Sequence, residues 1–434
     1  MAGVGVRPYA ELTFDADGDV DPASRAAVAR LDATDLVVFA HGWNSDRSSA
    51  TRLYDRFLAP FPALLGPGVR VGYVGVVWPS MRFSDEPIPD LDPVRPSLAL
   101  PGHGAGLDPA TVAALRAFWP GREAEVDRLA ALLEERPAGP EAAAGFGVAV
   151  ARLCGVGTGS GGPALFTGDP LRACRELAVA LAEAGGSVEV PVGWAEAAGA
   201  GPRAGARTAF LADERRALWQ GARELLRQAT YFEMKRRAGT VGERGLGPLL
   251  AGLAAARPAL RVHLIGHSFG ARLSAFALRA VPPGARWVRS LTLLQGAFSH
   301  HAFSTALPHD PGVGGALAGL QGRVAGPVVA CHSAHDTALG VFYPLASRTS
   351  GDERGLLGLG ERWGAIGYDG VRAVAGAPRL TLDRALASGL PRGGCVSVDA
   401  AAVVRRGGAP SGAHGDICHP ELARLVVSAG ELGP

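Results

Sequence analysis

The chain of 434 residues is longer than one ordinary domain, although a single elaborated α/β fold could hold it. Apolar residues make up 47% of the chain, which is ample for a large core. Its 43 Lys and Arg against 41 Asp and Glu give a net charge of +2, so electrostatics offer no reason to expect a nucleic-acid partner.

The sequence also bears on where the protein resides. No apolar run is long enough to cross a bilayer, and the N-terminus lacks the basic and apolar regions of a secretory signal. The five cysteines are widely spaced and odd in number, which argues against a disulfide framework. We expect a cytoplasmic protein without a transmembrane segment, and no pattern in the sequence indicates its oligomeric state.

The first eighty residues predict three strands and a helix. Residues 9–15 alternate as a strand does, and residues 22–31 follow as a helix with Asp21 as its cap. Asp35–Ala40 and residues 69–78 are apolar on both faces, which is typical of buried parallel strands.

Residues 84–205 differ in composition from the rest of the chain, and their pattern predicts a mostly helical insertion or lid. Prolines crowd residues 87–101, and glycine-rich joints separate four helical patches. The patches are Pro109–Phe118, Glu123–Glu135, residues 145–153 and residues 170–184. Residues 157–162 formally match G-x-G-x-x-G, but no strand leads into them and Pro163 blocks the helix that should follow. We therefore expect a joint there rather than a dinucleotide site.

The second half of the chain predicts strands that alternate with helices. Residues 211–235 form a strongly periodic helix, residues 238–245 a glycine-punctuated turn, and residues 248–256 a shorter helix. Later strands are expected at residues 262–265, 290–294, 327–331 and 395–404, with a terminal helix from Pro420. The chain thus divides into an α/β core, residues 1–83 and 206–434, and the insertion at residues 84–205.

This alternation predicts a mostly parallel, doubly wound sheet, in which ligands bind beyond the carboxyl ends of the strands. Polar clusters follow the expected strands at those ends. They are residues 41–44, Ser268, Gln295, Asp336 and His414. Their common position predicts one functional site at this edge of the sheet.

A candidate nucleophile lies in Gly266-His267-Ser268-Phe269-Gly270, between an apolar strand and an alanine-rich helix. This is G-x-S-x-G in its strand–turn–helix context, where the two glycines let strand and helix approach closely. The pattern predicts that Ser268 is held out at the end of the strand.

A serine nucleophile needs a base, and the base needs an orienting acid. Two histidines follow Ser268 in suitable loops, His414 and His419. We favour His414, because His419 precedes a helix whose N-terminal dipole would oppose the imidazolium that catalysis forms. Asp336 follows the strand at residues 327–331 and is the preferred acid. The alternatives are Asp310, which reads as a turn residue, and Asp416, which reads as a local cap.

The oxyanion of a tetrahedral intermediate needs two converging N–H donors. We expect one from Phe269 and one from Trp43 in the loop after Asp35–Ala40, although Trp43 could instead be only a pocket wall. Residues at the same edge are candidates for substrate contacts, although packing is the favoured role for His267 and for nearby His263, which flank the Ser268 motif. The candidates are His41, Gly42, His267 and Gln295.

His41-Gly42-Trp43, the Ser268 motif, Asp336 and His414 together resemble the α/β-hydrolase superfamily. Within that superfamily, the sequence pattern is most similar to that of bacterial lipase- or esterase-like serine hydrolases without an assigned substrate. The resemblance covers residues 35–80 and 206–427. It implies a cofactor-free ester hydrolase with the triad Ser268, Asp336 and His414. The large insertion precedes the nucleophile strand here, whereas the lids of that family usually follow it.

The expected function is therefore hydrolysis of a small-molecule or lipid ester, including a thioester, through an acyl-enzyme. Acyl transfer to another acceptor uses the same residues and is an alternative. A catalytically silent binding or scaffold protein is a second alternative, since a fold does not fix a function. A metal hydrolase is a third, but no tight metal motif supports it and we expect no bound metal. Its ligands would come from His332, His335, Asp336, His414, Asp416 and His419.

Overall fold

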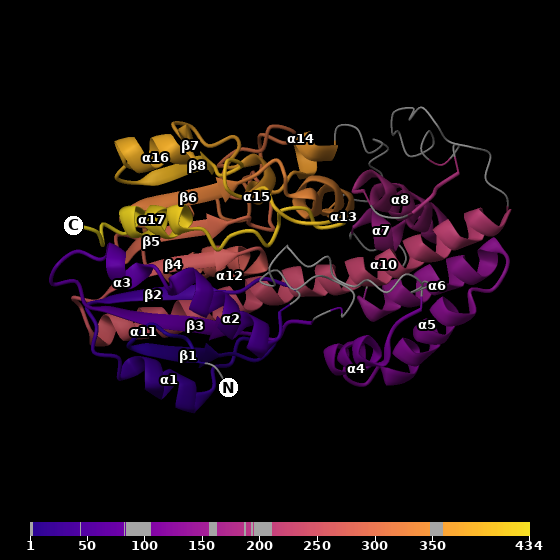
Figure 1. Cartoon of the computed structure of the whole chain (residues 1–434), viewed down its shortest axis with the longest axis horizontal. Coiled ribbons are helices and arrows are strands. Elements are labelled where there is room, and N and C mark those ends of the chain that lie inside the picture. The colour runs from indigo at the N-terminus through magenta and orange to yellow at the C-terminus, as the bar shows by residue number, and fades with distance from the viewer. Residues whose placement is uncertain are drawn as a thin grey trace.

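The computed structural model describes residues 3–43, 45–81, 83, 106–155, 163–185, 188–191, 194, 211–347 and 359–434. Within these residues, eight strands form one all-parallel sheet in the order β1-β3-β2-β4-β5-β6-β8-β7 (Figure 1). The strands are β1 Tyr9–Thr13, β2 Asp35–Ala40, β3 Val71–Val77, β4 Arg261–His267, β5 Val288–Leu294, β6 Pro327–His332, β7 Arg379–Thr381 and β8 Gly394–Asp399. The expected parallel sheet is confirmed. Its strand order is not the usual one of α/β hydrolases.

Helices cover both faces of the sheet. Along β2, alternate side chains enter two separate cores, Val38 with one layer of helices and Phe39 with the other. Helices α1, α11 and α12 contribute to the first core, and α2, α3, α16 and α17 to the second. This two-faced burial explains why the strand sequences are apolar throughout.

The helices have the following bounds: α1 Pro22–Ala29, α2 Arg47–Leu58, α3 Phe61–Leu64, α4 Pro109–Phe118, α5 Glu123–Glu135, α6 Pro140–Leu153, α7 Ala164–Thr167, α8 Pro170–Glu183, α10 Leu211–Thr240, α11 Gly247–Ala256, α12 Phe269–Ala277, α13 Tyr343–Ser347, α14 Leu359–Trp363, α15 Ile366–Asp369, α16 Leu382–Ser388 and α17 Pro420–Ala429. The last expected strand ends at Asp399 rather than at residue 404. The G-x-G-x-x-G match lies outside the described residues.

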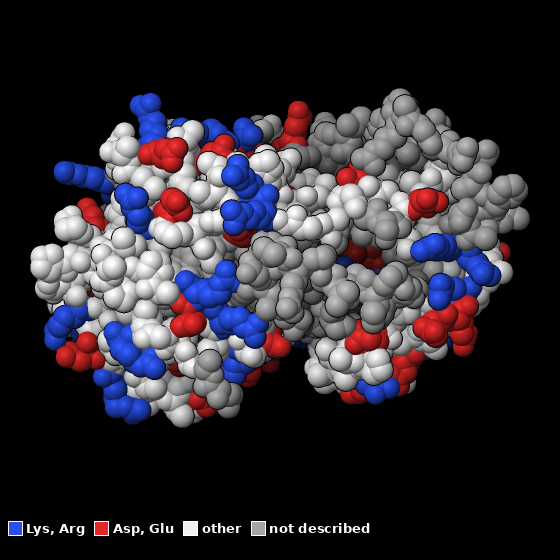
Figure 2. Space-filling model, in the orientation of Figure 1, with Lys and Arg blue, Asp and Glu red and all other residues white. Residues whose placement is uncertain are grey.

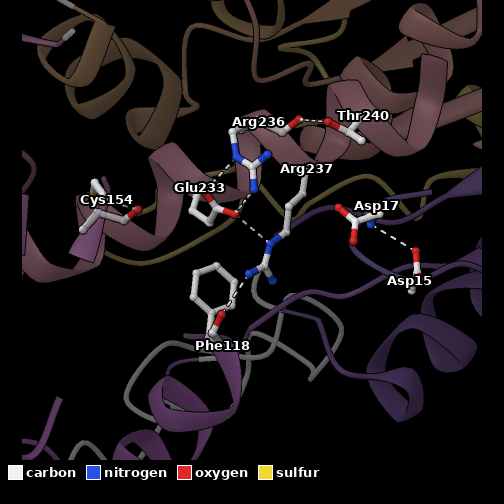
Figure 3. A network of polar contacts seen from close by, with 9 residues as sticks. Asp15, Asp17, Phe118, Cys154, Glu233, Arg236, Arg237 and Thr240 are labelled. Carbon is white, nitrogen blue, oxygen red and sulfur yellow. Dashed lines mark hydrogen bonds and ion pairs between the residues drawn. The ribbon is translucent and has the colours of Figure 1, made fainter. Parts of the chain in front are cut away.

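Helix α10 joins the insertion to the sheet. Figure 1 shows α4 to α8 gathered around the part of α10 that lies away from the sheet, and α10 packs against α6, α8 and α12. At the end of α10, Arg237 donates a 2.8 Å hydrogen bond to the carbonyl oxygen of Phe118 at the end of α4 (Figure 3). Glu233 accepts hydrogen bonds from both Arg236 and Arg237, which fixes this contact.

The prediction of a turn at residues 238–245 is wrong. The helix continues there as a π-helical turn, η1 (Val241–Leu246), and runs on into α11. Its glycines serve close packing instead of chain reversal. A Cβ on Gly242 would lie 2.2 Å from the carbonyl oxygen of Leu273 in α12, and one on Gly245 would lie 2.5 Å from that of Gly18.

The surface fits the small net charge. On the face in Figure 2, acidic and basic side chains of the described residues are interspersed over the sheet and the insertion. No helix in the described part of the chain is both long and apolar enough to cross a membrane.

Candidate active site

The carboxyl ends of β2, β4, β5 and β6 meet at one edge of the sheet, because neighbouring strands are paired in parallel. Ala40 lies beside Gly266, His267 beside Leu294, and Leu294 beside Cys331. The segments that leave these strands carry the residues that the sequence singled out.

Ser268 lies at the sharp turn between β4 and α12. Its backbone has φ 56° and ψ −119°, a strained conformation for a residue with a side chain. The turn is held by Ser268 N, which donates to the Leu294 carbonyl at 3.0 Å, and by Ala297 N, which donates to the Ser268 carbonyl at 3.1 Å. A Cβ on Gly266 would lie 2.3 Å from the Gly270 carbonyl oxygen, so only glycine lets the strand and helix lie this close.

Ser268, His414 and Asp336 form one hydrogen-bonded chain. The Ser268 hydroxyl lies 2.8 Å from His414 Nε2, and His414 Nδ1 lies 2.7 Å from Asp336 Oδ2. The Asp336 side chain is fully buried, and its second oxygen accepts a 3.0 Å hydrogen bond from the Leu339 amide. A carboxylate held in this way fixes the imidazole so that its Nε2 atom can accept the serine proton.

The alternative base and acids lie elsewhere. His419 Nε2 lies 2.9 Å from Asp416 Oδ1, and His419 occupies the N-cap position of α17 without a side-chain capping bond. Asp416 also accepts hydrogen bonds from the amides of Arg405 and Arg406, so it organises the His414 loop. Asp310 is exposed in a tight turn. None of these residues contacts Ser268 in the part of the chain that the structure describes.

The loop after β2 packs directly onto the start of α12. A Cβ on Gly270 would lie 2.5 Å from the His41 carbonyl oxygen, and one on Gly42 would lie 2.6 Å from the Ser268 Cβ. Among the described residues, the amides of Trp43 and Phe269 donate no hydrogen bond. Free N–H groups directly after Ser268 and after Gly42, the residue that packs on Ser268, suit the stabilisation of an oxyanion.

His267 and His41 are buried and hold the backbone of the loops around Ser268. Both are at most 5% exposed. His267 Nε2 donates a 2.8 Å hydrogen bond to the His414 carbonyl oxygen, which anchors the loop that carries His414. His41 Nδ1 donates to the Gly42 carbonyl oxygen at 2.8 Å, and its ring stacks on Trp78. Burial lowers the pKa of His267 to about 3 and that of His41 to about 4, so both rings are neutral at physiological pH.

Two further residues can now be placed. Gln295 follows β5 with φ 44°, is fully buried, and neither amide atom of its side chain has a partner among the described residues. His263 lies at the opposite end of β4, where it bonds Asp35 at 3.0 Å and Ser290 at 3.1 Å. His263 is therefore a packing residue of the sheet.

The structure adds residues that the sequence did not indicate. Tyr231 of α10 packs its ring on Phe269, with ring centroids 4.5 Å apart, and on Trp43 at 5.7 Å. The Tyr54 hydroxyl accepts from the His41 amide, and Trp78 Nε1 donates to the His41 carbonyl oxygen. Tyr231 lies within the periodic helix expected at residues 211–235, a pattern that predicts core packing.

Metal ligation is not favoured by this geometry. The described residues contain no group of three or more His, Cys, Asp or Glu side chains arranged to hold a metal ion. His332, one of the candidate ligands, lies 3.5 Å from the Arg379 guanidinium, a cation that opposes metal binding.

Comparisons with known proteins found no match to this chain among protein-family models, curated proteins or solved structures. The chemistry of the site therefore carries the functional argument.

Proposed function

We propose that the protein is a serine hydrolase of the α/β-hydrolase superfamily that cleaves a carboxylic ester, a thioester or lipid ester included, through an acyl-enzyme. The observation that carries this proposal is the chain of hydrogen bonds from Ser268 through His414 to buried Asp336, at 2.8 and 2.7 Å. The order of serine, acid and histidine along the chain is that of α/β hydrolases, as are the elbow and the position of the second oxyanion loop.

In this mechanism Ser268 Oγ attacks the ester carbonyl carbon while His414 Nε2 takes the hydroxyl proton. Asp336 accepts a hydrogen bond from His414 Nδ1–H and stabilises the imidazolium. The amides of Trp43 and Phe269 bind the oxyanion of the tetrahedral intermediate. Collapse of the intermediate expels the alcohol, which His414 protonates, and a water molecule activated by the same histidine then releases the acid.

Hydrolysis of p-nitrophenyl butyrate by wild type and Ser268→Ala tests this proposal. Loss of the nucleophile should lower kcat by at least about 10,000-fold, since the serine and its base act as one unit. Ser428→Ala is the matched control, because Ser428 is exposed on α17. Equal rates for wild type and Ser268→Ala would overturn the proposed function.

A further inference from the structure

Two polar side-chain atoms in the aromatic cluster that packs on Phe269, the residue after Ser268, are buried without a hydrogen-bond partner among the described residues. They are Trp43 Nε1 and the Tyr231 hydroxyl oxygen. A buried donor without a partner costs about 1–3 kcal/mol, so such groups are rare and their presence requires an explanation.

Both side chains pack against residues next to Ser268 of the proposed active site. The Tyr231 ring contacts the rings of Trp43 and Phe269, the two residues whose amides flank Ser268. Tyr231 comes from α10, which crosses from the insertion to the sheet (Figure 1). The pair therefore lies where α10 meets the loop after β2.

The chemistry of these two side chains favours a hydrogen-bond acceptor as their partner. An indole N–H can only donate a hydrogen bond. Burial, Tyr343 and the Asp336 carboxylate raise the pKa of Tyr231 well above its ordinary value, so its hydroxyl keeps its proton and can donate.

Two basic side chains, Lys235 and Arg272, lie near Tyr231. Lys235, the only lysine of the chain, lies 4.8 Å above the ring of Tyr343, and Tyr343 in turn packs against Tyr231. Arg272, one helical turn after Ser268, donates to the Lys235 carbonyl oxygen at 2.7 Å. Neither cation has a carboxylate partner within the part of the chain that the structure describes. Burial and the nearby Arg272 lower the pKa of Lys235 to about 7, so Arg272 is the main positive charge near Tyr231, where the Asp336 carboxylate also acts.

We propose that Trp43 Nε1 and the Tyr231 hydroxyl bind an acceptor oxygen that the substrate carries close to its scissile carbonyl group. The substrate is then an oxygen-substituted ester and not a plain alkyl ester. This inference rests on the proposed function, because it takes the ligand of the site to be an ester. It explains why the fold retains two buried donors that it does not itself satisfy.

Three isosteric esters test this proposal by binding alone, in the Ser268→Ala background, where no turnover occurs. Butyl butyrate carries no extra oxygen, butyl methoxyacetate carries an ether oxygen on the acyl side, and 2-methoxyethyl butyrate carries one on the alcohol side. We expect Ser268→Ala to bind one of the ether esters about three- to tenfold more tightly than butyl butyrate, the worth of one hydrogen bond. Adding Tyr231→Phe should abolish that preference.

Tyr9→Phe in the same background is the matched control. The Tyr9 hydroxyl is also buried without a partner among the described residues, but it lies on β1 at the far edge of the sheet. Both Tyr→Phe changes should raise the melting temperature or leave it unchanged, and only Tyr231→Phe should remove the preference. Equal dissociation constants for the three esters, no binding of any of them, or a preference that survives Tyr231→Phe would overturn the inference.

Hydrolysis of the same esters by the wild-type protein keeps the two proposals apart. If the wild-type protein binds an ether ester preferentially but leaves all three esters intact, the proposed hydrolase function fails alone. If it hydrolyses them with no preference, the inference about Trp43 and Tyr231 fails alone.

Discussion

Ser268 has a strained backbone and is also the first residue of the hydrogen-bonded chain that runs through His414 to Asp336. The φ of 56° holds the side chain out at the end of β4, and His414 Nε2 lies 2.8 Å from its hydroxyl. Strain of this kind costs about 1–3 kcal/mol and persists only where the surroundings fix it. Here the glycines on either side and the loop after β2 supply that constraint.

The proposed role of Asp336 as the acid can be tested against Asp310, the alternative acid in the sequence. Asp336→Asn should lower kcat for ester hydrolysis about 1,000- to 10,000-fold, because the amide no longer holds His414 in the required tautomer. Asp310→Asn should leave kcat unchanged, since Asp310 lies in an exposed turn. Steady-state kinetics of both variants measure this, and a larger loss in Asp310→Asn would reassign the acid.

Much of the site could be predicted at this scale because its signals are local. G-x-S-x-G between a strand and a helix identifies Ser268 without any tertiary information. The helix-dipole argument favours His414 over His419, and of these two His414 lies 2.8 Å from the Ser268 hydroxyl while His419 bonds Asp416. Tyr231 could not be found in this way, because its position in a periodic helix predicts core packing and a pocket wall equally well.

Among the elements, the junction of α10, η1 and α11 differs most from the sequence-based expectation. Glycines at residues 238–245 predict a turn, yet a glycine can equally mark a place where two backbones approach closely. The contacts with α12 and with the turn after β1 decide between these meanings. The short edge strand β7 (Arg379–Thr381) was not expected either, since three residues carry no periodic signal and depend on pairing with β8.

The packing of η1 makes a testable prediction. Gly242→Ala should lower the free energy of unfolding by about 1–3 kcal/mol, because its Cβ would press on the backbone of α12. Gly252→Ala is the control within α11, where a Cβ would meet nothing within 4 Å. That change should raise the free energy of unfolding by about 0.5–1 kcal/mol. Urea denaturation of both variants measures the difference, and stabilisation by both substitutions would contradict the packing described here.

For the whole molecule, buried neutral histidines link stability to pH. Burial lowers the pKa of His41 to about 4, that of His267 to about 3 and that of His332 to about 4. In the unfolded chain these histidines titrate near about 6.5. The unfolded state therefore binds more protons than the folded state below that pH, so stability present above it is lost as the pH falls toward 4.

Each of these histidines contributes a slope of up to about 1.4 kcal/mol per pH unit in that range. Urea unfolding at closely spaced pH values from 7.5 to 4.5 should show the free energy of unfolding decline. His332→Gln removes one such histidine outside the proposed triad. It should lower the slope of the free energy of unfolding against pH by the equivalent of about one proton taken up on unfolding. An unchanged slope in His332→Gln would mean that His332 titrates alike in both states.

The parallel arrangement of the strands is the property of the whole molecule that the sequence predicted best. Strands apolar on both faces and intervening helices require layers on both sides of a sheet, and β2 shows this with Val38 and Phe39 in opposite cores. The order of the strands could not be predicted, because it depends on pairings between segments far apart in the chain, such as β2 with β4.

Covalent labelling with a fluorophosphonate probe tests the central claim most directly, because the probe reacts with a serine only when a base and an oxyanion hole activate it. We predict that the wild-type protein forms one adduct, mapped by peptide mass spectrometry to Ser268, and that His414→Ala and Ser268→Ala form none. An unlabelled wild-type protein, or an adduct on another serine, would contradict the account and favour a fold that binds ligands without chemistry.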